Sequence, residues 1–209
     1  MANARLTIPL FLSLFGSLAL GVGGALAGCG GSSSSTSGDG GGGGASSTVT
    51  GAGGGSDCRA DKDGCYNYSE SCFKGDTPVV TFKQEVLPIL RTSCGLSSSC
   101  HGNESGPGGQ HYLGPKLSDP DPTDAQIALI FEQSVGKTPV VNAGMNLITP
   151  GDPEHSFFMY KLDGVACPKL ACADSKSCGG LMPLGSTSPM PADKRDTLRR
   201  WIAQGAKND

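Results

Sequence analysis

Cysteine content most restricts what this chain can fold into, because eight of its nine cysteines lie after residue 57. In an exported chain, an even number of cysteines indicates disulfides that form in an oxidising compartment. The sequence leaves their pairing open. The eight are Cys58, Cys65, Cys72, Cys94, Cys100, Cys167, Cys172 and Cys178.

The N-terminus indicates export. Residues 1–28 combine Arg5 with an apolar run that ends in small residues, which is the layout of a secretory signal. The segment Leu26-Ala27-Gly28-Cys29 resembles the bacterial lipoprotein lipobox, which implies cleavage and lipid attachment at Cys29. An uncleaved anchor is the alternative, since about 20 residues can span a bilayer. By analogy, Gly30 after the cysteine favours the outer membrane, so we expect a lipid-anchored protein of the cell envelope.

Three regions follow the signal. Residues 29–56 hold Cys29 and a tract of Gly, Ser, Thr and Ala, which cannot bury a core and is predicted to be a disordered tether. Residues 57–76 form a cysteine-rich cap with few large apolar side chains, and residues 77–209 form the main domain. The net charge of −3 and the lack of a basic patch argue against a nucleic-acid partner.

Two amphipathic segments predict the first two helices. The first spans residues 81–90, with a capping box between Thr81 and Gln84, and Pro88 should kink or end it. The second starts at Asp121-Pro122-Thr123 and stops at Gly136.

Two further helices are expected in the second half. One starts at Gly151-Asp152-Pro153, with Asp152 as the N-cap and Pro153 in the first helical position. The last spans residues 192–204, buries Trp201 and ends at Gly205. Because no alternating strand pattern of useful length occurs, the predicted fold is mainly α with long loops.

The segment from Cys94 to His101 carries the most specific chemistry. A cysteine followed directly by histidine, with a second cysteine upstream, is typical of c-type haem attachment, in which both sulfurs bind the haem and the histidine binds iron. Two residues usually separate the cysteines, whereas five separate Cys94 from Cys100. These five residues must loop outward for both sulfurs to reach one haem, and Gly95 would permit such a loop.

Four segments together resemble the c-type cytochrome domains of exported planctomycete and myxobacterial proteins. Their order and spacing extend over residues 82–206, nearly all of the folded part. The segments are Val86-Leu87-Pro88-Ile89-Leu90, Cys100-His101-Gly102, Thr149-Pro150-Gly151-Asp152-Pro153, and Met182-Pro183-Leu184-Gly185 before Trp201-Ile202-Ala203-Gln204-Gly205-Ala206.

The resemblance implies a small cytochrome c-like domain with one haem c. In that family the cysteine-histidine element attaches the haem and the methionine of the Met-Pro segment is the sixth iron ligand. The implied residues are therefore Cys94 and Cys100 for attachment, and His101 and Met182 for iron. Other candidate ligands are Met190, Met145, His111 and His155, and the candidate pocket walls are Phe131, Phe157, Phe158, Leu162 and Trp201.

Two functions remain open. The first is electron transfer by a tethered monohaem protein to a redox protein partner, which leaves six cysteines for three disulfides once Cys29 is lipidated. The second is a haem-free module with a structural or binding role, which leaves eight cysteines and allows a bridge from Cys94 to Cys100. We expect no enzyme, because the sequence has no nucleophile constellation, phosphate loop or zinc-type histidine pair.

Overall fold

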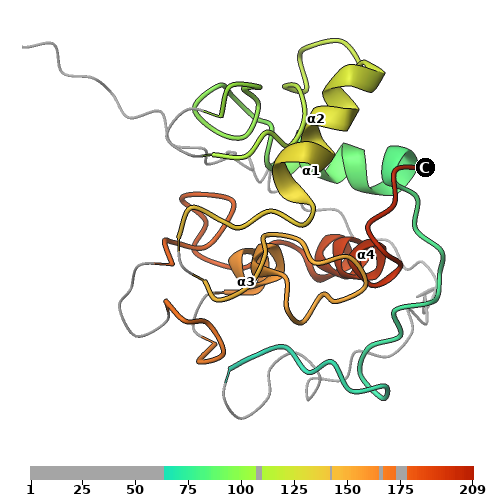
Figure 1. Ribbon diagram of the computed structural model, residues 1–209, viewed down its shortest axis with the longest axis vertical. Coiled ribbons are helices and arrows are strands. Elements are labelled where there is room, and N and C mark those ends of the chain that lie inside the picture. Colours follow the sequence, from blue (N-terminus) through green and yellow to red (C-terminus); the bar gives the residue numbers. More distant parts are fainter. Residues whose placement is uncertain (1–63, 107–109, 142, 165–166, 173–177) are drawn as a thin grey trace, which may run out of the picture.

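The computed structural model describes residues 64–106, 110–141, 143–164, 167–172 and 178–209. Its helices are the π-helical turn η2 (Phe82–Val86), α1 (Leu87–Ser93), α2 (Asp124–Ser134), α3 (Phe157–Asp163) and α4 (Ala192–Ala203), shown in Figure 1. The described residues form no strand, only isolated bridges from Val135 to Ile148 and from Asn146 to Ser156. The mainly helical fold with long loops is therefore confirmed. None of these helices is both long and apolar enough to cross a membrane. The signal segment, the tether and Cys29 lie outside the described residues.

The first helix is longer than predicted and starts differently. It begins as η2, in which the Leu87 N–H donates to the Phe82 carbonyl five residues back, and it continues as α1 to Ser93. Pro88 lies in the first turn of α1, where a missing N–H is tolerated, so it does not end the helix. The predicted capping box is wrong: Glu85, not Gln84, accepts hydrogen bonds from the Thr81 N–H and hydroxyl.

The second and fourth helices match the prediction. At α2, the Thr123 hydroxyl accepts from the Gln126 N–H while the Gln126 amide oxygen accepts from the Thr123 N–H, which completes a capping box. The chain leaves α2 through Gly136, whose φ of +68° suits glycine. After α4 the chain turns at Gly205, as expected.

The third helix starts later than predicted. The Asp152 carboxylate accepts from the His155 N–H at 3.0 Å and contacts the His155 ring, so it caps a turn that precedes the helix. The hydroxyl of Ser156 donates to the Asp152 carbonyl and closes this turn. Helix α3 therefore begins at Phe157, with Ser156 as its N-cap.

An aromatic cluster connects three helices that lie far apart in the sequence. The Phe82 ring centroid lies 4.8 Å from that of Phe131 and 5.6 Å from that of Trp201, which connects η2, α2 and α4. The C-terminus returns to the same place (Figure 1), because the Asp209 carboxylate accepts from the Phe82 N–H at 2.8 Å. Residues near the start of η2 and the C-terminal Asp209 therefore pack in the same part of the core.

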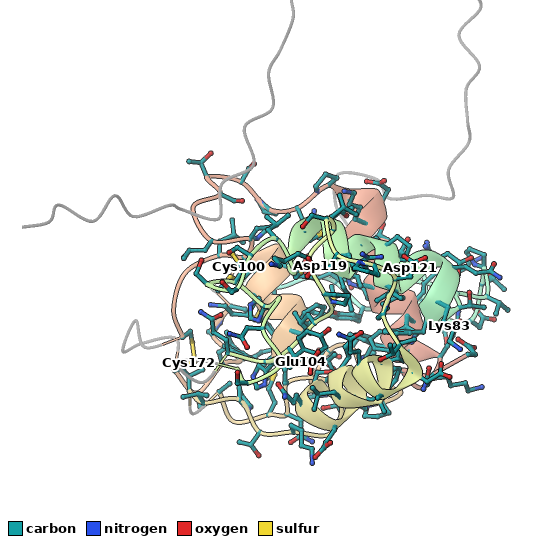
Figure 2. The ribbon with its side chains drawn as sticks, turned by 90° about the horizontal axis from the view of Figure 1, so that it is seen from above. Lys83, Cys100, Glu104, Asp119, Asp121 and Cys172 are labelled. Atoms are coloured by element: carbon teal, nitrogen blue, oxygen red, sulfur yellow. A yellow bond between two sulfur atoms is a disulfide. The ribbon has the colours of Figure 1, made fainter. Side chains whose placement is uncertain are left out.

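The cap is joined to the main domain by a disulfide and a buried arginine. Cys65 bonds to Cys167, 102 residues later. The Arg199 side chain is fully buried, lies 3.6 Å from the Tyr66 ring centroid, and donates two hydrogen bonds to Asp163. A second disulfide joins Cys172 to Cys178. Seen from above (Figure 2), Cys100 and Cys172 lie toward one end of the molecule and Lys83 toward the other.

Candidate functional site

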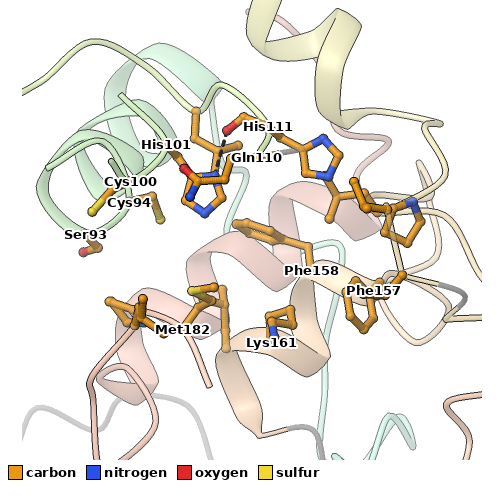
Figure 3. Close-up of a pocket in the computed structure, with 18 of the residues that line it drawn as sticks. Ser93, Cys94, Cys100, His101, Gln110, His111, Phe157, Phe158, Lys161 and Met182 are labelled. Carbon is orange, nitrogen blue, oxygen red and sulfur yellow. Dashed lines mark hydrogen bonds between the residues drawn. The ribbon is translucent and has the colours of Figure 1, made fainter. Parts of the chain in front are cut away.

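A cavity of about 230 Å³ lies between the end of α1, the cysteine-histidine segment and α3 (Figure 3). Most of its walls are apolar. Its rim includes Val140 and Leu184, which are exposed hydrophobic side chains. The lining includes Cys94, Cys100, His101, His111, Leu113, Leu147, Phe157, Phe158, Lys161, Leu162, Met182 and Pro183.

Backbone hydrogen bonds close the segment between the two cysteines into a loop. The Cys94 carbonyl accepts from the His101 N–H at 3.0 Å, while the Ser97 carbonyl accepts from the Cys100 N–H at 3.1 Å. Residues 95–99 therefore form a loop whose two ends, Cys94 and His101, are joined by a hydrogen bond. As a result Cys94 and Cys100 both line the cavity, although five residues separate them.

Two glycines allow the close packing of this loop. A Cβ at Gly95 would lie 2.9 Å from the Gly114 carbonyl oxygen, and one at Gly102 would lie 2.8 Å from the Gly95 carbonyl oxygen. Neither distance is compatible with a larger residue on the present backbone. Gly95 is therefore needed because the Gly114 carbonyl packs directly against it, a contact that the sequence does not reveal.

The His101 ring is held in one tautomer. Its Nδ1 lies 2.7 Å from the His111 carbonyl oxygen, and because a carbonyl only accepts, Nδ1 carries the proton. The lone pair of Nε2 is then available to a metal, and a histidine that donates its other ring N–H to a carbonyl is the usual arrangement of a metal ligand. Burial lowers the pKa of His101, which favours the neutral, metal-binding form.

Met182 lies across the cavity from His101. Figure 3 shows His101 on one side and Met182 on the other, with Cys94 and Cys100 beside the histidine. The Met182 N–H donates to the Lys161 carbonyl at 2.8 Å, which fixes the segment to α3. Met190 is only 4% exposed and packs in the core, away from the cavity lining. Of the two methionines that the sequence offers as candidate ligands, Met182 lines the cavity and Met190 does not.

The other candidate ligands differ in position. His111 lines the cavity and also supplies the carbonyl that holds His101. His155 is exposed and contacts Asp152, and Met145 packs against the core outside the cavity lining.

The predicted walls are partly wrong. Phe157, Phe158 and Leu162 line the cavity. Phe131 and Trp201 do not, because both pack against Phe82 in the aromatic cluster.

The two cysteines of the motif have different states. Cys94 is a buried free thiol, and burial raises its pKa to about 12. A bridge from Cys94 to Cys100, which the haem-free interpretation allows, is therefore not formed. Cys100 is disulfide-bonded in this structure, as is Cys72. A thioether at Cys100 would use the same sulfur, so the disulfide and haem attachment are alternative states of this residue.

Sequence reasoning missed Lys161. Its side chain is 9% exposed and lines the cavity, and its Nζ donates to the carbonyls of Cys178 and Gly180. Burial lowers the pKa of Lys161. One signal could have found it, since Lys161 interrupts the bulky apolar run from Phe157 to Leu162.

The donor set limits the metal chemistry of the site. His101 and Met182 offer one imidazole nitrogen and one thioether sulfur from opposite sides of the cavity, and the described residues contain no group of three or more His, Cys, Asp or Glu side chains that could hold a metal ion. The chain matches no protein-family model, no curated protein and no solved structure in the comparisons made.

Proposed function

We propose that this chain is a membrane-tethered c-type cytochrome-like lipoprotein that carries one haem c and transfers electrons in the cell envelope. The observation that carries the proposal is the placement of His101 and Met182 on opposite sides of an apolar cavity, with Cys94 and Cys100 at its edge. The lipidated Cys29 and the tether attach it to the membrane. Its redox partner is another protein.

The residues present fit this cofactor. In the proposed site Cys94 and Cys100 would hold the haem covalently, once the disulfide at Cys100 is reduced, and His101 and Met182 would bind its iron. The His111 carbonyl orients the imidazole, while Phe157, Phe158 and Leu162 exclude water. Haem supplies a centre that takes up and releases one electron, and a methionine ligand raises its reduction potential.

Thiol counting supports attachment. With lipid on the Cys29 sulfur, eight cysteines remain, and the free thiol of Cys94 leaves seven. An odd number cannot pair completely within one chain. Thioethers at Cys94 and Cys100 instead leave six, of which Cys65, Cys167, Cys172 and Cys178 form the two described disulfides.

A haem-free module is the second candidate, favoured by the disulfide at Cys100. In that case the apolar cavity binds no haem and the domain has a structural or binding role. The two candidates can be told apart at Cys100, whose sulfur is joined to a haem carbon in the first and to another sulfur in the second.

Expression of the full chain with haem-attachment machinery distinguishes them. We expect one haem per chain, seen as sharp absorption bands and as a mass increase that survives denaturation. Peptide mapping should place the haem on the peptide that contains Cys100 and His101, and Cys94→Ser should leave a single thioether. The same chain expressed without the machinery is the control. A colourless protein of plain polypeptide mass, with Cys100 in a disulfide, would refute haem binding.

A pair of methionine variants tests the sixth ligand. Met182→Ala should keep the covalent haem but open one iron position, so that the ferrous protein binds carbon monoxide, which the wild type should not. Met190→Ala should leave the ligand set unchanged and lower the free energy of unfolding by about 2–5 kcal/mol, because it removes a buried side chain. Carbon monoxide binding by Met190→Ala alone would assign the ligand to Met190. Spectral titration and chemical denaturation measure the two effects.

A further inference from the structure

Lys161 is a buried cation without a described counter-ion. The side chains of Arg91, Arg195 and Arg199 are each 13% exposed or less, and each pairs with an aspartate. No carboxylate of the described residues lies within ion-pair distance of the Lys161 Nζ, which instead bonds to two backbone carbonyls. The Phe157 ring centroid lies 5.7 Å from it. Among the described residues, the ammonium is therefore solvated by carbonyl dipoles and has no carboxylate beside it.

The same residue holds the segment that carries Met182. Its Nζ donates to the Cys178 carbonyl at 2.8 Å and to the Gly180 carbonyl, and its own carbonyl accepts from the Met182 N–H. The segment wraps closely around the ammonium, since a Cβ at Gly179 would lie 3.2 Å from Nζ. Lys161 thus holds residues 178–182 through three hydrogen bonds. The side chains of Lys161 and Met182 both line the cavity.

We propose that Lys161 is a positioning residue that raises the reduction potential of the site by placing one fixed positive charge behind the Met182 segment. The inference rests on the proposed function. The ferric site carries one more positive charge than the ferrous site, so a nearby fixed cation disfavours the ferric state, and the apolar surroundings weaken the screening of that charge. The single electron that reduces the site comes from the redox partner, or from a mediator in a potentiometric titration, and no proton is transferred.

Three variants of the full, haem-bearing chain test this at one fixed pH. Lys161→Met removes the charge with similar length, Lys161→Arg keeps the charge, and Lys169→Met removes the same charge from an exposed ion pair with Glu154. We expect Lys161→Met to shift the reduction equilibrium about tenfold toward the oxidised form, which is 59 mV for one electron. Lys161→Arg and Lys169→Met should each shift it less than about threefold.

The outcomes separate charge from packing. An unchanged midpoint potential in Lys161→Met overturns the inference, and so does an equal fall in Lys161→Arg, because that fall would come from lost packing. If Lys161→Met yields too little folded protein, Lys161→Gln can still donate to the carbonyls without a charge, and it should show the same fall. An unchanged potential in Lys161→Gln likewise overturns the inference. A wild-type chain without haem would refute the proposed function itself, before any potential is measured.

Discussion

Replacing His101 by alanine should abolish the low-spin haem spectrum and reduce haem content to below about a tenth of the wild-type value. The reason is geometric, because the His111 carbonyl holds the Nδ1–H of His101 and leaves its Nε2 available at this wall of the cavity. Pyridine haemochrome absorbance per polypeptide measures the content. His155→Ala is the matched control, since its ring is exposed and contacts only Asp152; it should retain full haem.

A wild-type spectrum in His101→Ala would move the ligand role to another residue. His111 is then the next candidate, because its ring also lines the cavity. His111→Ala would then show this directly, since it should lose the spectrum that His101→Ala keeps.

Asp163→Asn should lower the free energy of unfolding by about 3–5 kcal/mol, because it removes the charge that compensates buried arginines. The Asp163 carboxylate accepts two hydrogen bonds from Arg199, whose side chain is fully buried, and pairs with Arg195. Without it, the Arg199 guanidinium keeps Asp196, the Tyr68 hydroxyl and the rings of Tyr66 and Tyr68. Chemical denaturation with the disulfides intact measures the loss.

The matched control is the same substitution at an exposed partner. Asp121 pairs with Arg91 at 2.6 Å, but its own side chain is 97% exposed. Arg91 also donates to the carbonyls of Lys116 and Asp119, so it keeps partners when the carboxylate is lost. Asp121→Asn should therefore cost less than about 1 kcal/mol. Equal losses in the two variants would contradict the assignment of Asp163 as the compensating charge.

Local signals predicted α2 and α4 well. The start at Asp121-Pro122-Thr123 and the glycines at positions 136 and 205 act within a few residues, so their effect can be predicted from the sequence, whereas the Thr123–Gln126 capping box was not predicted. The predicted caps of the first and third helices are wrong, because another polar residue nearby makes the hydrogen bond. Glu85 replaces Gln84 as the cap of the first helix, and Asp152 bonds to His155 in a turn instead of capping α3. In each case two nearby polar residues could serve, and tertiary packing selects one.

The site divides in the same way. The proposed role of His101 can be inferred from its neighbours in the sequence. The proposed choice of Met182 over Met190 depends on which of them lies across the cavity, because both precede a proline. Aromatic residues cannot be assigned to a wall or to the core from periodicity alone, which is why Trp201 was placed wrongly. Lys161 was missed because a lysine is usually exposed, whereas here two carbonyls satisfy its ammonium.

The hydrogen bond from the His101 N–H to the Cys94 carbonyl also bears on how such chains are found by sequence searches. Because that bond joins the two ends of the segment, the five residues between the cysteines form a loop, of which Ser99 also lines the cavity. A search pattern that demands a fixed gap between the cysteines passes over this chain, whereas one that fixes only Cys-His and a downstream Met-Pro retains it.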